Sequence, residues 1–132
     1  MGRNAIHTEG APKAVGPYSQ GIRTGELLFV SGQLPKPADG DLFDDVAAAT
    51  RQALDNVMAI VEAGGMTMDD VVKVTIFLRD MESFAVVNEA YADYFSDPAP
   101  ARACIEVAAL PLNACLEIEA IAVSPERRPR LD

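Results

Sequence analysis

Apolar residues in the middle of the chain recur with the period of a helix. Between Asp44 and Gly65 they return every three or four positions, which places them on one helix face. Asp44 and Asp45 precede the run, where the positive end of the helix dipole favours acidic side chains. Gly64 and Gly65 follow it as a stop signal. The pattern predicts an amphipathic helix whose buried face carries Val46, Ala49, Ala53, Val57, Ile60 and Val61.

A strand and a second helix follow. Residues 71–79 alternate and are rich in β-branched side chains, which predicts a strand. Helical spacing of Phe84, Val87, Tyr91 and Phe95 then predicts a helix over residues 81–95, and we interpret its aromatic residues as core or interface residues. The SDPAP segment at 96–100 ends the helix because proline cannot continue the hydrogen-bond ladder. The expected faces of the strand are Val72, Val74, Ile76 and Leu78 on one side, and Lys73, Thr75 and Phe77 on the other.

The two ends of the chain have the pattern of short strands. Apolar pieces alternate with Gly and Pro in the first third, and Gly25-Glu26 predicts a tight hairpin between two of them. Residues 101–107 and 115–123 predict two further strands, linked around Pro111. Strands, helix, strand, helix and two strands predict a single α+β domain, with two helices on one face of a mixed sheet.

Two helices cover only one face of such a sheet. The other face is expected to carry Phe77, Ile121 and Val123, which are all apolar. An exposed apolar sheet face marks an interface. The pattern therefore predicts an oligomer without fixing the number of subunits.

Composition narrows the classes of partner. The chain has 132 residues, which suits one domain. Its net charge is −9, from 11 basic and 20 acidic side chains. Nucleic-acid binding depends on Lys and Arg that neutralise phosphates, and basic residues cluster only in the tail over 125–132, which we interpret as solvated. A nucleic-acid partner is therefore not expected.

The cysteines and the apolar runs bear on location and cofactors. Cys104 and Cys115 stand without a partner cluster, which fits a reducing compartment. The N-terminus has no signal-peptide core, and no stretch reaches the ~18 apolar residues of a membrane span. A cytoplasmic protein without a membrane partner is expected. One histidine and two cysteines lack metal-ligand spacing, and Gly64-Gly65 lacks the rest of a nucleotide-binding motif, so neither metal nor cofactor is expected.

The two C-terminal strands carry the candidate chemistry. Alternation places Arg102 and Cys104 on one face of the first strand, and Glu117 and Glu119 on one face of the second. If the strands pair as a hairpin around Pro111, Cys104 lies opposite Glu117. Arg102 then lies diagonal to Glu117, at roughly 7–8 Å. One interpretation is a cross-strand ion-pair network. The other is a site in which Arg102 grips a substrate carboxylate and Glu117 acts as general base.

Covalent catalysis is less favoured. His7 is the only histidine and lies near the N-terminus, so any histidine-dependent triad would rest on it. A nucleophilic Cys104 needs a base or positive charge that lowers its pKa. Arg102 would help, but Glu117 would oppose it. We interpret Cys104 as a buried thiol.

The chain contains several ordered motifs: GPYSQG at 16–21, SGQLP at 31–35, TRQALDNVMAIVEAGG at 50–65, VVKVTIFLRDMESFAVVNEAY at 71–91, PARACIEVAALP at 100–111 and LEIEAIAV at 116–123. In this order they resemble the RidA/YjgF family of reactive-intermediate deaminases. The resemblance spans about residues 5–124, within an expected deaminase domain over 1–124.

The resemblance implies a fold, an assembly and a reaction. The fold is chorismate-mutase-like, and the assembly is a homotrimer around a central barrel with three sites between subunits. The reaction is hydrolysis of 2-aminoacrylate and related enamines, through 2-imino acids such as 2-iminopropanoate and 2-iminobutanoate, to 2-keto acids and ammonia. It protects metabolism from reactive intermediates and requires no cofactor.

The resemblance also implies roles for individual residues. Arg102 matches the arginine that holds the substrate carboxylate, and Glu117 matches the glutamate that positions water. Cys104 matches a cysteine whose backbone contacts the substrate. The SDPAP segment looks shorter than in many relatives, so side-chain preference is open. The remaining cleft residues implied are Tyr18, Ser31, Gly32 and Asn88.

Three other functions remain open at this level. A non-catalytic module would sense a small carboxylate through the same Arg102 site. A translation-inhibiting ribonuclease is an activity ascribed to some relatives, although the charge of −9 speaks against it. A chaperone-like holdase would use apolar surface and would not depend on Glu117.

Overall fold

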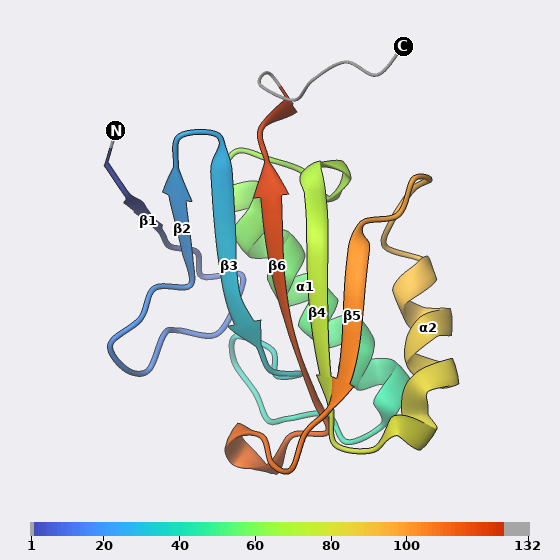
Figure 1. Ribbon diagram of the computed structural model, residues 1–132. Coiled ribbons are helices and arrows are strands. Elements are labelled where there is room, and N and C mark those ends of the chain that lie inside the picture. The colour runs from blue at the N-terminus through green and yellow to red at the C-terminus, as the bar shows by residue number, and fades with distance from the viewer. Residues whose placement is uncertain (1, 126–132) are drawn as a thin grey trace.

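A computed structural model of the chain describes residues 2–125, in which one six-stranded mixed sheet carries two α-helices on one face (Figure 1). The predicted basic tail lies outside these residues, apart from Pro125. The sheet order is β1-β2-β3-β6-β4-β5. The strands are β1 Asn4–Ile6, β2 Gly21–Thr24, β3 Leu27–Gln33, β4 Val71–Leu78, β5 Ala101–Glu106 and β6 Leu116–Val123. The helices are α1 Val46–Ala63 and α2 Phe84–Ala92, with 3₁₀ turns at Met68–Asp70, Met81–Ser83 and Pro111–Asn113.

The β2–β3 hairpin forms at the predicted turn. Thr24 pairs with Leu27, so Gly25 and Glu26 make a two-residue loop. Gly25 has a φ of 59°, a conformation that suits glycine and the tight hairpin turns that match strand twist. The prediction at this position is confirmed.

The predicted hairpin between the last two strands is wrong. β5 pairs in parallel with β4, and β4 pairs on its other edge, antiparallel, with β6. The helix α2 provides the crossover that a parallel β4–β5 pair requires. Residues 107–115 then carry the chain past the end of β4 to its far side. The buried strand β4, with Val74, Ile76 and Leu78 at most 1% exposed, thereby has hydrogen-bonded neighbours on both edges.

Helix α1 follows the sequence prediction closely. The Asp45 side chain accepts a hydrogen bond from the Ala48 backbone N–H at 3.0 Å, which caps the first turn. At the other end the Gly64 N–H donates to the Ile60 carbonyl, and Gly65 adopts a φ of 85°. A Cβ at Gly64 would lie 2.9 Å from Leu28 of the sheet, so glycine also permits close packing there.

Helix α2 is shorter than the predicted span of 81–95. Its entry is a single 3₁₀ turn, in which the Asp80 side chain accepts from the Glu82 N–H and Glu106 of β5 accepts from the Met81 N–H. The helix ends at Ala92 because the next backbone bonds are the tighter 3₁₀ type, including Tyr94 N–H to the Tyr91 carbonyl.

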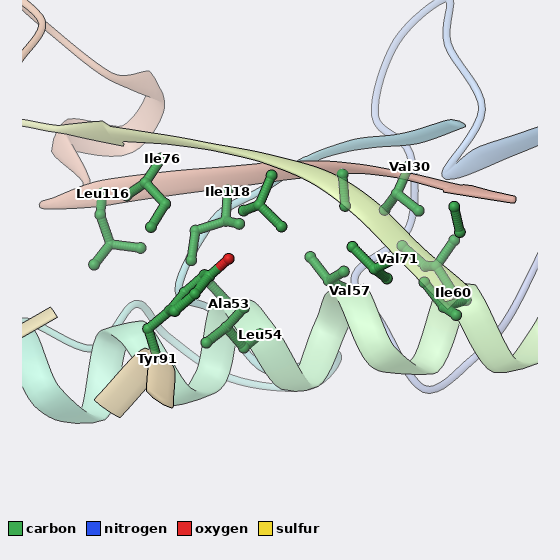
Figure 2. Packing of buried hydrophobic residues seen from close by; sticks show 14 of the residues in the cluster. Val30, Ala53, Leu54, Val57, Ile60, Val71, Ile76, Tyr91, Leu116 and Ile118 are labelled. Atoms are coloured by element: carbon green, nitrogen blue, oxygen red, sulfur yellow. The ribbon is translucent and has the colours of Figure 1, made fainter. Parts of the chain in front are cut away.

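The hydrophobic core fills the layer between the helices and the sheet. Figure 2 shows Leu54, Val57 and Ile60 of α1 facing Ile76 and Ile118 of the sheet. Tyr91 reaches into the same layer from α2 and is 6% exposed.

Val72 does not lie on the strand face that the sequence predicts for it. The pairing of β4 shifts register between Val71 and Lys73, so Val71 is buried and Val72 is 37% exposed. A bulge changes the parity of a strand, and alternation alone does not reveal it. The assignments for residues 73–78 are confirmed.

The opposite face of the sheet has no helix over it within the described residues. Phe77, Ile121 and Val123 lie on it, as predicted, because their strand neighbours point into the core. Phe29 and Leu27 of β3 pair with Ile121 and Val123 and are 42% and 38% exposed. The apolar surface of this face therefore includes residues of β3, β6 and β4, with the polar side chains of Lys73, Thr75, Glu117 and Glu119 between them.

Candidate active site in two halves

The Arg102 side chain lies on the helix face of the edge strand β5. Arg102 pairs with Val74, whose side chain points into the core. Its guanidinium carbon is 4.8 Å from the ring centroid of Tyr91 and 5.5 Å from that of Phe84, both in α2. Among residues 2–125 no acceptor forms a hydrogen bond or ion pair with this guanidinium. Its five N–H groups therefore remain available to a carboxylate.

Asn88 and Cys104 lie on the same side of the sheet as Arg102. Asn88 is on α2, between the two aromatic residues, and its Oδ1 is buried without a hydrogen-bond partner in the described part of the chain. Cys104 pairs with Ile76 and packs against the core. Burial raises the pKa of the Cys104 thiol and outweighs the opposing effect of Arg102. A protonated thiol is a weak nucleophile, which agrees with the non-catalytic interpretation. We call Asn88, Arg102 and Cys104 the β5–α2 group.

The Glu117 side chain lies on the other face of the sheet. It is on β6 and pairs with Phe77, which points away from the helices. A Cβ at Gly32 would lie 2.6 Å from Glu117 Oε2, so the carboxylate rests directly against the backbone of β3. Gly32 lies where β3 shifts register between Val30 and Gln33. The absent side chain of Gly32 thus leaves the space that the carboxylate occupies.

The environment of Glu117 makes it a stronger base than a free carboxylate. Burial raises the pKa of Glu117, and the negative charge of Glu119 raises it further. Glu119 lies two residues along on the same face of β6, opposite Thr75. A carboxylate whose pKa is closer to neutrality accepts a proton from water more readily.

Tyr18 and Ser31 lie beside Gly32. The Ser31 hydroxyl donates to the Ser19 carbonyl at 2.6 Å, and the Ser31 N–H donates to the Gln20 carbonyl at 3.0 Å, which joins the 16–21 loop to β3. Tyr18 is half exposed, and with Gly32 it lines a surface pocket of about 450 Å³. We call Tyr18, Ser31, Gly32 and Glu117 the β3–β6 group.

The expectation that Arg102 and Glu117 share one patch of one chain is therefore wrong. The structure brings the seven predicted residues together in two groups, one on each face of the sheet. The physical reason is the inserted strand: β4 separates β5 from β6, and Val74, the partner of Arg102, points opposite to Phe77, the partner of Glu117.

Two kinds of residue escaped the sequence interpretation. The sequence pattern predicts Phe84 and Tyr91 only as core or interface residues, although their spacing around Asn88 places all three on one helix face, toward the strand that follows. Gln20, inside GPYSQG, is 2% exposed, and its amide group bonds Thr8, Ala11 and Pro12. A glutamine in a short segment bounded by Gly16 and Gly21 is a sequence signal for a side chain that organises the loop by hydrogen bonds.

Two properties of the described residues bear on metals and membranes. Over residues 2–125 no three His, Cys, Asp or Glu side chains gather as metal ligands. None of the helices in that range has the length and apolar character needed to cross a bilayer.

Comparison with known proteins identifies the family. The family model described as Endoribonuclease L-PSP matches residues 8–124. The 2-iminobutanoate/2-iminopropanoate deaminase of Escherichia coli K12 is 51% identical in an alignment of 122 residues that covers 89% of this chain and 95% of that protein.

Two solved structures from Escherichia coli share the fold. The YjgF gene product superposes with a TM-score of 0.86 at 47% identity, covering 95% of this chain and 99% of that one. TdcF with bound serine superposes with a TM-score of 0.87 at 42% identity, covering 91% and 98%. Because the family match spans nearly the whole described chain, and relatives are about half identical to it, the chain belongs to the Endoribonuclease L-PSP family, the RidA/YjgF family that its motifs resemble.

Proposed function

We propose that this protein hydrolyses short 2-imino acids, formed from enamines such as 2-aminoacrylate, to 2-keto acids and ammonia. The observation that carries the proposal is the Arg102 guanidinium, which has no acceptor among the described residues and lies beside two aromatic rings. A relative of 51% identity is named for deamination of 2-iminobutanoate and 2-iminopropanoate, which are small carboxylates. The substrate class follows from the match between that name and the free guanidinium.

We further propose that a complete site forms between two copies of the chain in a homotrimer. One copy would contribute the β5–α2 group and its neighbour the β3–β6 group, because one chain holds them on opposite faces of the sheet. The uncovered apolar surface around Phe29, Phe77 and Ile121 supports self-association. Closed cyclic assembly then repeats the same composite site at each interface.

The reaction follows from the two groups. Arg102 binds the substrate carboxylate in a bidentate grip and thereby orients C2. The water oxygen adds to C2 of the imine while Glu117 removes a proton from that water. The proton then passes to the imine nitrogen. In the resulting carbinolamine the hydroxyl proton moves to the amino nitrogen, the C–N bond breaks, and ammonia leaves as the carbonyl forms. The imine is already electrophilic, so general-base assistance of about 10²–10⁴-fold suffices.

The proposal is tested by following a reactive enamine directly. A dehydratase generates 2-aminoacrylate from serine, and its decay is measured with and without this protein. We expect faster decay and stoichiometric keto acid and ammonia. Arg102→Lys should lose most of the acceleration because an ammonium cannot reproduce the planar guanidinium fork. Equal decay in the presence and absence of the wild-type protein would refute the proposal.

A ribonuclease is the second candidate, because the family model carries that description. The net charge of −9 opposes binding of a polyanion. RNA cleavage that co-purifies with the protein and survives Arg102→Ala would indicate a contaminant. Cleavage that disappears with Arg102→Ala and Glu117→Ala would favour the ribonuclease instead.

We also propose that the protein works in the cytoplasm. Both cysteines, Cys104 and Cys115, are free thiols, and each is partly buried. Free thiols are typical of a reducing compartment. Fractionation of cells that express a tagged protein would test the location.

A further inference from the structure

We infer that Phe84 and Tyr91 are positioning residues, which hold the Arg102 guanidinium in the orientation that receives a carboxylate. The inference rests on the proposed function, because it concerns the same arginine. Neither aromatic residue is assigned a part in the chemistry itself.

The first step is the manner in which Arg102 is held. A long arginine side chain samples many rotamers unless its end has a partner. Within residues 2–125 the only contacts that orient the guanidinium are with the faces of two rings, at 4.8 Å for Tyr91 and 5.5 Å for Phe84. Both distances lie within the ~6 Å range of cation–π attraction.

The second step is that aromatic partners leave the ligand-binding capacity of the arginine intact. A carboxylate partner within the chain would occupy the N–H groups and compete with a substrate carboxylate. A ring attracts the positive charge without accepting those N–H groups in conventional hydrogen bonds. The pair therefore orients the guanidinium and keeps its donors free.

The third step is that the two rings differ in how deeply they are buried. Tyr91 is 6% exposed and packs against the Phe95 ring, with centroids 4.7 Å apart, so its position is fixed by the core. Figure 2 shows the Tyr91 side chain directed between α1 and the sheet. Phe84 is 38% exposed at the start of α2. Tyr91 thus provides a buried ring for the guanidinium, and Phe84 provides a partly exposed one.

The effect of the two rings on KM and kcat depends on whether the charge of the substrate carboxylate changes during the reaction. The substrate carboxylate remains an anion throughout the reaction, and a guanidinium that has lost one ring still orients C2 once substrate is bound, so the rings contribute equally to binding of the ground state and of the transition state. Loss of uniform binding raises KM and leaves kcat nearly unchanged. A cation–π contact at an exposed site accounts for about a two- to fivefold change in KM.

The main test compares Phe84→Leu with Phe43→Leu. Phe43 is 39% exposed, like Phe84, but is not among the rings in cation–π contact with Arg102 in residues 2–125, so it controls for loss of an exposed ring. We expect Phe84→Leu to raise KM about two- to fivefold at unchanged kcat, and Phe84→Tyr to restore KM. Equal KM in Phe84→Leu and wild type, or a fall in kcat alone, would overturn the inference.

Tyr91 provides a second, independent variant pair. Its hydroxyl is buried without a partner in the described residues, so the ring alone is expected to act on Arg102. Tyr91→Phe, the conservative variant, should keep the wild-type KM, whereas Tyr91→Leu should raise it. A raised KM in Tyr91→Phe would show that the hydroxyl, not the ring, acts on the site.

A double-mutant cycle separates positioning from direct contact between Phe84 and the substrate. The effect of Phe84→Leu on the Kd of 2-ketobutyrate, measured by calorimetry, should disappear in an Arg102→Gln background. A Phe84 effect that persists without the arginine would mean direct contact and would overturn the inference. This binding assay does not need turnover. A wild-type protein that binds 2-ketobutyrate in a Phe84-dependent manner but accelerates no hydrolysis would therefore refute the proposed function alone.

Discussion

The carboxylate of Glu117 and the missing side chain of Gly32 form one unit at the scale of single residues. The carboxylate occupies the space in which any Cβ at position 32 would lie. The same confinement removes water from Glu117 and, with Glu119 nearby, raises its pKa. Local space and local charge thus both adjust the proposed base.

The raised pKa of Glu117 predicts a shift in the pH profile. The base must be deprotonated, so kcat/KM should fall as the pH drops below the pKa of Glu117 in the free protein. Glu119→Gln removes the second cause of the raised pKa, and therefore the acidic limb should move to lower pH. The measurement is the pH dependence of kcat/KM for both proteins. An acidic limb that stays in place, or moves upward, would contradict the assignment.

The space at Gly32 predicts a coupled effect on stability. Gly32→Ala should lower the free energy of unfolding by about 1–3 kcal/mol, because the added methyl overlaps the Glu117 carboxylate. It should also lower kcat by displacing that group. In a Glu117→Ala background the cost to stability should largely vanish, since the overlapping atoms are gone. Denaturant titration of the four proteins gives the cycle, and additive costs would argue against this account.

At the scale of helices and strands, contacts at the helix termini set where α1 begins and ends and where α2 begins. α1 begins where Asp45 caps it and ends where Gly64 permits close packing on Leu28. α2 begins through a 3₁₀ turn held by Asp80 and by Glu106, which gives Glu106 a structural role. The aromatic face of α2 thereby reaches the edge strand β5, beside Arg102.

The cap of α1 predicts that alanine substitutions of two neighbouring aspartates lower the free energy of unfolding by different amounts. Asp45→Ala should destabilise the protein by about 1 kcal/mol, because the Ala48 N–H loses its acceptor. Asp44→Ala should cost only a few tenths of a kcal/mol, from the loss of a charge near the helix dipole. Thermal or denaturant unfolding distinguishes the two variants. Equal costs would show that charge, rather than the cap bond, stabilises this end of the helix.

At the scale of the whole molecule, the sheet divides the predicted site. Its helix face holds the β5–α2 group, and its uncovered face holds the β3–β6 group within an apolar surface. A second copy supplies the missing half and also covers the apolar surface in the proposed assembly. Catalysis and self-association would then depend on the same interface.

Subunit mixing provides a direct test of the composite site. Arg102→Ala and Glu117→Ala should each be inactive, yet co-expression in equal amounts should restore roughly a quarter of wild-type activity, since one interface in four pairs an intact arginine with an intact glutamate. The double variant mixed with Arg102→Ala should restore none. Mixed oligomers isolated with two different tags, but without activity, would show that the halves do not meet between copies.

The elements with local signals were predictable, and the bulges and pairings were not. The period of α1, the Gly25 hairpin and the alternation of residues 73–78 are set by neighbouring residues and were recovered. The exposure of Val72 depends on a register shift with β6, which lies far along the chain. The sequence predicted Phe84 and Tyr91 only as core or interface residues, because their contact with Arg102 exists only once α2 lies beside β5.

The sequence by itself determined the class of fold, the two helices, the uncovered apolar face and the residue types of the candidate site. These properties follow from periodicity and composition, which act over a few residues. The tertiary structure alone decided that β4 lies between β5 and β6, which places Arg102 and Glu117 on opposite faces. Strand order depends on pairings between residues far apart in the sequence, and no local pattern encodes it.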